Sequence, residues 1–504
     1  MFLLVSVLLL SFYVQAQSVK EKSDVNFAVR IVANKLSDPW SMIIGPDHQL
    51  WVTEAKGYKV LRIDPADGKK QVLLDLNKER SFPKKENGAE KKDGGIPWPQ
   101  GGLMGMALHP ALLEGKPYVY LAYIYKFEGT SEKGGIGKSD TTKNKPDGFY
   151  FKTKIVRYTY DSRAAKLHKP VILCDTIPGS SDHNGGRLII STINDKEYLF
   201  YAIGDMGAGQ FANGGRKNKA QDKQSYEGKI LRFNTEVDGD SNAAEQWIPN
   251  DNPFNSSRQN AVWTIGHRNP QGLDAVQING ETIFYSCEHG PYSDDEVNII
   301  EKGKNYGHPF ITGYADGNYD GLAASVSNKQ DLPGQWHTSY PLINSEEKNA
   351  DSIGVDYRDP VKSFNPSSKR TMVSLFNKIK DGDSKVEWAS YAPSSIMVYK
   401  SAAIPGWQNS LLIPTLKGGR LLRLKLDTTG KRVTQDVFSY AQGNVRYRDV
   451  AVSADGLKLY LAVDSSMVSS GPSKENPKVV SYRGCIIELS YQPGHKETAK
   501  LNEE

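Results

Sequence analysis

The stretch RLIISTINDKEYLFYAIGD, residues 187–205, contains the pattern that decides the fold. A short apolar run at 187–190 leads through a polar turn to a second apolar run, which ends on Gly204 and Asp205. Apolar runs rich in Ile, Tyr and Phe and separated by Asn and Asp are typical of paired β-strands. The stretch therefore predicts two antiparallel strands that are followed by a polar residue.

The same unit occurs six times along the chain. Its copies are residues 40–47 with 50–54, 102–108 with 118–120, 187–190 with 198–205, 272–276 with 283–286, 392–398 with 411–414, and 449–452 with 459–463. A strand pair this short cannot bury its own faces, and radial repetition of four-stranded blades solves that problem. We therefore predict an all-β fold, a six-bladed β-propeller, with residues 17–504 as a single domain.

Composition agrees with this fold and excludes some functions. The chain has 504 residues with 46 Gly and 26 Tyr, which favours strands and turns over helices. Its net charge of +5 is small, and the basic residues are spread, so we expect no nucleic-acid partner. The three cysteines lie far apart in apolar runs and predict no disulfide framework.

The first residues and the loops add expectations about location. Residues 2–14 form an apolar stretch too short to span a bilayer, and small residues follow, so residues 1–16 are predicted to be a signal peptide. We expect an exported protein, periplasmic or secreted, without a membrane span. Residues 84–95, 128–145 and 320–385 are predicted insertions between strands, and 493–504 a mobile tail.

The repeat also predicts where a site lies. In a propeller, the residues before each inner strand and after each second strand meet at one mouth of the central channel. Those residues are Gln100, Asp182, His183, Arg268, Asn269, Arg446 and Arg448 before the units, and 205–210, 288–291 and Lys417 after the second strands. Four cations, a histidine and amides predict a pocket for a polyanionic organic molecule together with a metal.

The segment 263–314 is the richest part of this set. It contains IGHRNPQGL at 265–273 and GPYSDDE at 290–296. Arginine binds carboxylates through two hydrogen bonds, and carboxylates and turn carbonyls are calcium ligands. Three adjacent acids are also common in a solvated turn, so the acids alone leave both readings open.

These segments closely resemble the soluble pyrroloquinoline-quinone (PQQ)-dependent glucose dehydrogenases of the glucose/sorbosone dehydrogenase group. The resemblance runs in order from Leu36 to about Leu489, and residues 416–417 and 444–450 also carry it. It implies a quinoprotein oxidoreductase that oxidises an aldose at C1 to the lactone. It further implies PQQ and Ca²⁺ as cofactors, an external electron acceptor and a possible homodimer.

The resemblance also implies roles for single residues. His183 resembles the general base, with Asp182 beside it, and Arg268 and Asn269 resemble the pair that polarises the quinone oxygens. The residues that match cofactor contacts are Gln100, Asp182, Gln210, Arg268, Asn269, Lys417, Arg446 and Arg448. Those that match sugar contacts are Trp388, Gln100 and Gln210. Each of these residues also has an ordinary structural alternative. The histidine and the tryptophan would be core residues, the cations would form surface salt bridges, and the glutamines would lie on the surface.

Two calcium sites follow from the same resemblance. The carbonyls of Gly290 and Pro291 would bind a calcium ion that touches the quinone. The second, structural site would involve Glu296, Tyr306, Thr312, Tyr314 and Asp316, joined by Glu346 or Glu347.

The chain departs from the family pattern at several positions. Lys385 stands where the family has a second aromatic near the sugar, and His308 replaces a tryptophan. Residues 206–209 also differ, and a cysteine pair at the fifth blade is absent. These changes leave the preferred sugar open.

Two other functions fit a propeller of this kind. One is a calcium-dependent sugar-lactone hydrolase, which would give no role to Arg268, Lys417, Arg446 and Arg448. The other is a non-catalytic carbohydrate-binding propeller, and the retention of His183 with all four cations argues against it.

Overall fold

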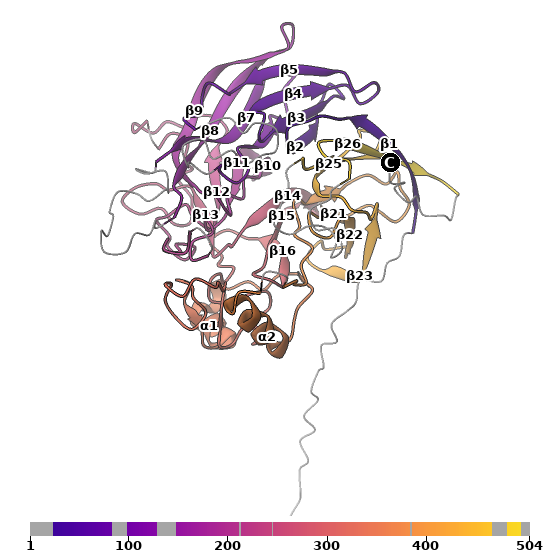
Figure 1. Ribbon diagram of the computed structural model, residues 1–504. Coiled ribbons are helices and arrows are strands. Elements are labelled where there is room, and N and C mark those ends of the chain that lie inside the picture. Colours follow the sequence, from indigo (N-terminus) through magenta and orange to yellow (C-terminus); the bar gives the residue numbers. More distant parts are fainter. Residues whose placement is uncertain are drawn as a thin grey trace, which may run out of the picture.

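Six four-stranded antiparallel sheets make up most of the computed structural model (Figure 1). The structure describes residues 24–82, 98–128, 148–210, 213–243, 245–383, 386–465 and 481–494. The predicted signal peptide, most of the predicted tail, the 84–95 loop and Lys385 lie outside these residues, as does almost all of 128–145.

Each sheet is one blade, with its strands in chain order from the centre outward. Blade one contains β2 (Pro39–Ile44), β3 (Leu50–Glu54), β4 (Lys59–Ile63) and β5 (Lys70–Asp75). Blade two contains β6 (Leu103–Leu108), β7 (Tyr118–Phe127), β8 (Phe151–Asp161) and β9 (Lys166–Gly179). Blade three contains β10 (Leu188–Ile193), β11 (Lys196–Ile203), β12 (Lys229–Asn234) and β13 (Val262–Ile265).

The second half of the ring follows the same order, with one exception at its end. Blade four contains β14 (Pro270–Ile278), β15 (Glu281–Glu288), β16 (Asp295–Ile300) and β19 (Lys362–Phe364). Blade five contains β20 (Met397–Tyr399), β21 (Ser410–Pro414), β22 (Leu421–Leu426) and β23 (Val433–Tyr440). Blade six contains β24 (Tyr447–Val452), β25 (Lys458–Val463) and β26 (Ile486–Gln492), and β1 (Asn26–Ala33) is its outer strand.

The inner strands close the ring. β2, β6, β10, β14, β20 and β24 contact one another in that order, and β24 contacts β2 again. β1 pairs antiparallel with β26, so the two ends of the described chain are joined in one blade. The six predicted units are the first two strands of the six blades, and the six-bladed propeller is confirmed.

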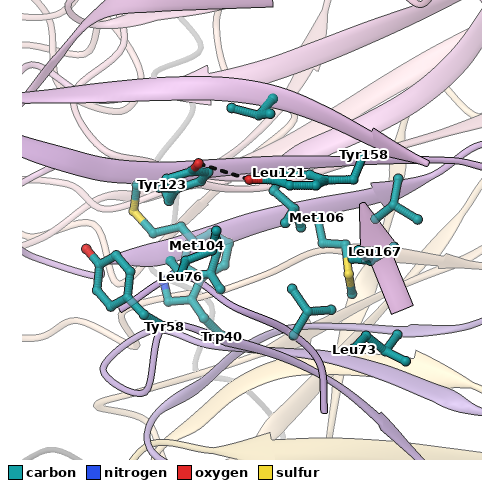
Figure 2. Close-up of a cluster of buried hydrophobic side chains, with 14 of the residues drawn as sticks. Trp40, Tyr58, Leu73, Leu76, Met104, Met106, Leu121, Tyr123, Tyr158 and Leu167 are labelled. Carbon is teal, nitrogen blue, oxygen red and sulfur yellow. Dashed lines mark hydrogen bonds between the residues drawn. The ribbon is translucent and has the colours of Figure 1, made fainter. Parts of the chain in front are cut away.

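Strand alternation explains why these strands are apolar on both faces. In β11, Leu199, Tyr201 and Ile203 pack against blade two, whereas Tyr198, Phe200 and Ala202 pack against blade four. Successive side chains point to opposite faces, so a strand between two blades needs apolar residues at every position. The core is therefore divided into six clusters, one between each pair of neighbouring blades. Figure 2 shows the cluster between blades one and two, where the Tyr123 and Tyr158 hydroxyls lie 3.1 Å apart.

The predicted insertion at 320–385 is largely structured. It contains β17 (Leu322–Ala323), β18 (Leu342–Ile343), α1 (Glu346–Ile353), the 3-10 helix η2 (Gly354–Asp356) and α2 (Lys369–Lys380). It also contains β19, so it supplies the outer strand of blade four. The helices lie together at the lower edge of the molecule (Figure 1), and their core includes Tyr292, Trp336, Tyr340 and Phe376.

The cysteines agree with most of what the sequence predicts. All three are free; Cys287 and Cys485 are buried, but Cys174 is only partly buried on an outer strand. Within the described ranges, no helix is long and apolar enough to cross a membrane.

Candidate active site

A cavity of about 640 Å³ opens at one mouth of the central channel. It is lined by the loops that precede inner strands and follow second strands, as the repeat predicts. Ten of the predicted site residues line it: Gln100, Asp182, His183, Gln210, Arg268, Gly290, Trp388, Lys417, Arg446 and Arg448. Asn269 lies just behind the wall, fully buried, and accepts a hydrogen bond from Gln271, which also lines the cavity.

His183 has an orientation that leaves one ring nitrogen toward the cavity. Its Nδ1 lies 2.7 Å from Asp205 Oδ1, and its Nε2 lies 3.0 Å from the amide nitrogen of Gln210. Because Asp205 is a carboxylate, Nδ1 carries the proton and Nε2 accepts. The local backbone is left-handed, with φ of 51° at His183. The Asp205 contact therefore orients the ring so that Nε2 lies at the cavity wall, where it can accept a proton.

Asp205 is the partner of His183, and the sequence alone assigned it no role. Burial alone would raise the pKa of this carboxyl, but the imidazoles of His183 and His308 outweigh it and hold the pKa well below the usual value. The only sequence signal was its place directly after β11, among the residues expected at the mouth. His308 and Tyr340 also contact Asp205. The sequence marked His308 only as a departure from the family pattern, and it carried no signal for Tyr340.

A chain of polar side chains crosses the cavity wall. Asp182 accepts from the amides of Gln100 (3.3 Å) and Gln210 (2.8 Å). Gln210 in turn accepts from Arg268 Nη2 at 3.0 Å. The four residues come from four different connections: Gln100, Asp182 and Arg268 precede the inner strands of blades two, three and four, and Gln210 follows the second strand of blade three. The closed ring is what brings them together.

Arg268 is buried at the centre of this wall. Its backbone N–H donates to Glu288, and its Nη1 donates to the carbonyls of His289 and Gly290, both at 3.2 Å. Its Nε is buried and has no hydrogen-bond partner among the described residues. An unsatisfied buried donor costs free energy, so this nitrogen is suited to an acceptor that enters the cavity.

Lys417, Arg446 and Arg448 also line the cavity. Lys417 Nζ lies 4.0 Å from the centroid of the Trp388 ring and donates to the Trp388 carbonyl. Burial lowers the pKa of Lys417 to about 8 and that of Arg446 to about 10. Arg448 is paired with Asp464 through two hydrogen bonds of 2.9 and 2.7 Å.

Cations outnumber acids in the cavity. The lining contains Lys56, Arg268, Lys417, Arg446 and Arg448 against Asp38, Asp182 and Asp464. Lys56, which the sequence reasoning missed, donates to the carbonyls of Pro99 and Gly101. An excess of buried cations favours an anionic ligand, and the donors present match carboxylates and carbonyl oxygens.

The predicted quinone-side calcium ligands have partners within the chain. The Gly290 carbonyl accepts from Arg268, and the Pro291 carbonyl accepts from the hydroxyl of Tyr319. Asp295 is not available to a metal, because its oxygens accept from Gly290, Ser390, Tyr391 and Ala392. His289 lies beside this turn and is neutral, since burial, His183 and Arg268 lower its pKa to about 3.

The second predicted metal site falls on four neighbouring acids that we call the acidic cluster: Asp294, Glu296 and Glu346, which are buried, and Asp316, which is exposed. The loop at 312–319 joins it: Gly313 N–H donates to Glu296, and Thr312 and Gly317 N–H donate to Glu346. Burial raises the pKa of Glu346 to about 8 and that of Asp294 to about 6, and it raises those of Glu296 and Asp316.

Not every residue predicted for that site joins the cluster. The Tyr306 hydroxyl donates to the Ile299 carbonyl, and the Tyr306 ring stacks on His267 at 4.6 Å. Thr312 Oγ1 and Asn318 Oδ1 are buried without a hydrogen-bond partner in the described part of the chain. No group of three His, Cys, Asp or Glu side chains there is arranged as a metal site. The fit to calcium therefore rests on unsatisfied oxygens and carbonyls.

The fold and cavity together define a propeller with a cationic mouth and a histidine base. The sequence profile of the Glucose / Sorbosone dehydrogenase family matches residues 36–342 and 374–469, and the chain belongs to that family. The unmatched residues 343–373 fall in the insertion that contains α1 and β19.

Individual proteins are also similar to this chain over most of its length. The chain is 33% identical over 499 residues to quinoprotein glucose dehydrogenase B of Acinetobacter calcoaceticus, covering 95% of this chain and 93% of that protein. It is 25% identical over 444 residues to aldose sugar dehydrogenase YliI of Escherichia coli, covering 87% and 90%. The fold is similar to the PQQ-bound aldose sugar dehydrogenase of Streptomyces coelicolor, with a TM-score of 0.55, 23% identity, and 94% and 100% coverage.

Proposed function

We propose that this protein is a PQQ-dependent aldose dehydrogenase, which oxidises a glucose-like sugar at C1 to the lactone. The family membership and the 33% identity to a quinoprotein glucose dehydrogenase support the reaction class. The observation that carries the proposal within this chain is His183, an imidazole with its Nδ1 bound to Asp205 and its Nε2 at a cation-rich cavity.

The chain supplies a base for the proton of the anomeric hydroxyl. When the C1–H bond breaks, the carbonyl of the lactone forms and the hydroxyl proton passes to His183 Nε2. The bound quinone supplies the acceptor for the two electrons and the hydrogen that leave C1. A sugar hydroxyl must first replace the Gln210 amide, which lies 3.0 Å from His183 Nε2. Ionised Asp205 then stabilises the imidazolium that forms.

The cations are suited to hold the quinone. Its carboxylates would face Lys417, Arg446 and Arg448, and Arg268 would contact the quinone oxygens. Asn269, which lies behind the wall, would support this side of the cavity through its hydrogen bond with Gln271. The unsatisfied Arg268 Nε and the excess of cations support this assignment. Trp388, Gln100 and Gln210 would bind the sugar.

Calcium completes the proposal. We assign one ion to the carbonyls of Gly290 and Pro291 and a second to the acidic cluster with Thr312 and Tyr314. The three buried acids Asp294, Glu296 and Glu346, together with Asp316, have no ion pair with a cation among the described residues. They support the second ion, because a hard cation would let them ionise.

Reconstitution tests the function directly. Purified protein is loaded with calcium and PQQ, and dye reduction is measured against a panel of aldoses, with lactone hydrolysis measured in parallel. We expect dye reduction that needs both additions. Lactone hydrolysis with calcium alone, and no dye reduction, would replace our proposal with the hydrolase.

Export, the external electron acceptor and a homodimer are part of the same proposal. N-terminal sequencing of the secreted protein tests cleavage after residue 16, and light scattering tests the oligomeric state.

A further inference from the structure

The two oxygens of Asp205 have different partners. Oδ1 accepts from His183 Nδ1 at 2.7 Å and from the Gly207 N–H at 2.9 Å. Oδ2 accepts from His308 Nε2 at 2.8 Å, Asn218 Nδ2 at 2.9 Å and the Tyr340 hydroxyl at 2.5 Å. Five donors thus surround one fully buried carboxylate. A carboxylate has about four lone-pair positions, so Asp205 is saturated and cannot rotate without breaking contacts.

His308 donates a ring N–H to this carboxylate. An unprotonated Nε2 would place its lone pair 2.8 Å from a carboxylate oxygen, which is repulsive. The proton therefore lies on Nε2, as it lies on Nδ1 of His183. Two imidazoles on opposite oxygens hold Asp205 between them.

Tyr340 reaches Asp205 from the insertion. The Thr338 hydroxyl of the same segment donates to the Gly209 carbonyl, next to Gln210. The Tyr340 ring packs so closely on Gly209 that a Cβ there would lie 2.8 Å from ring atom Cδ2. Segment 338–340 is therefore built against the loop that carries Gln210, and Tyr340 is not a chance contact.

We propose that His308 and Tyr340 are positioning residues that occupy Oδ2 of Asp205 and thereby set the orientation and basicity of His183. Donors on Oδ2 withdraw negative charge from the carboxylate. Without them, Oδ1 would attract the imidazolium more strongly, and His183 would hold a proton to higher pH. This inference rests on the proposed function, because His183 is the base only in that function.

Other charged or titratable groups face the pair and stay constant in the test. They are Asp182, 3.8 Å from His183 Nε2, together with Arg268, Glu288, His289 and Lys229. A shift between variants therefore reports the change at Oδ2.

The test compares Tyr340→Phe, His308→Leu and His308→Gln in the full chain. Tyr399→Phe is the matched control, because that buried hydroxyl donates to the Gly456 carbonyl in another blade. Two quantities are measured against pH: turnover of the quinone-loaded enzyme, and carbethoxylation of His183 by diethyl pyrocarbonate in quinone-free protein, read by peptide mass spectrometry. The reagent attacks only the unprotonated ring.

We expect the midpoint of both profiles to rise by about half to one pH unit in Tyr340→Phe and His308→Leu, the scale of one hydrogen bond. His308→Gln, whose amide can still donate, should restore most of the shift, and Tyr399→Phe should show none. Unchanged midpoints in both Tyr340→Phe and His308→Leu would overturn the inference. A shift in carbethoxylation without any aldose oxidation would support the positioning role and reject the proposed function.

Discussion

Asp205 and the acidic cluster differ in the direction in which their surroundings shift the carboxyl pKa, although Asp205 and three of the four acids of the cluster are buried. Asp205, at the mouth, is held ionised because two imidazoles outweigh the effect of burial. The acidic cluster, beside the insertion, shows the reverse: burial raises the pKa of Glu346 to about 8 and that of Asp294 to about 6. Asp205 has N–H donors and imidazoles as neighbours, whereas the cluster has amides, hydroxyls and other acids.

The difference identifies what each region lacks. At the mouth, the chain itself supplies His183 and the cations, and the ligands that we propose for it are the sugar, the quinone and one calcium ion. The acidic cluster has oxygens but no ion pair with a cation among the described residues, which is why we propose that it takes a cation from solution. Substitutions at the mouth and removal of calcium from the acidic cluster should therefore have different measurable effects.

Removing the base should have the largest effect. We expect His183→Ala to lower turnover by about 10²–10⁴, the usual scale for a positioned base, with quinone affinity nearly unchanged. Quinone titration and dye reduction on the same variant measure both quantities. Turnover close to that of the parent protein would exclude His183 from the mechanism.

Removing calcium should act on the acidic cluster. A carboxyl whose pKa is higher in the folded state stabilises the fold below its unfolded pKa, and this stability is lost as pH rises through the folded pKa. For Glu346 that window runs from its ordinary value of 4.5 to about 8. In chelator, the melting temperature should therefore fall as the pH rises from 5 to 8. The free energy of unfolding should fall by about 1.4 kcal/mol for each pH unit in this window.

Added calcium should abolish this slope and restore activity, because the ion favours the charged carboxylates. Thermal melts at several pH values with and without calcium test both statements. Full activity in excess chelator would contradict the metal assignment.

Removing a mouth cation should weaken quinone binding. Each charge-assisted contact is worth about 1.5–3 kcal/mol, so Arg448→Ala or Arg446→Ala should raise the dissociation constant about tenfold or more. Arg30→Ala is the matched control, because Arg30 also makes two hydrogen bonds to an acid of blade six, Glu488, but lies outside the cavity. Unchanged affinity in both mouth variants would contradict the assignment.

Removing the aromatic wall should have the smallest effect. Trp388→Ala exposes part of the cavity that a sugar would cover, and the loss of about 1 kcal/mol of apolar contact should raise KM about fivefold. Turnover should change little, since Trp388 holds no proton. Trp388→Phe keeps an aromatic face, so its KM should lie between those of the parent protein and of Trp388→Ala. A change in turnover with constant KM would assign Trp388 to another role.

Much of this protein can be predicted from its sequence. The six strand pairs are visible because every blade repeats the same apolar pattern, as in residues 187–205, and closure into a ring is a geometric consequence of repetition. The same geometry predicts that Gln100, His183, Arg268, Lys417 and Arg448 meet at one mouth, because each lies at a fixed place relative to its strands.

Tertiary structure alone decided the rest. Asp205 is paired with His308 from the loop after β16 and with Tyr340 from the insertion, neither of which has a place in the repeat. The insertion also supplies β19 and the acid Glu346, although its sequence shows no period. Local patterns determine strands, since burial on both faces of a blade is a property of neighbouring residues. The charge state of a buried acid depends on side chains more than a hundred residues away, and only packing brings them together.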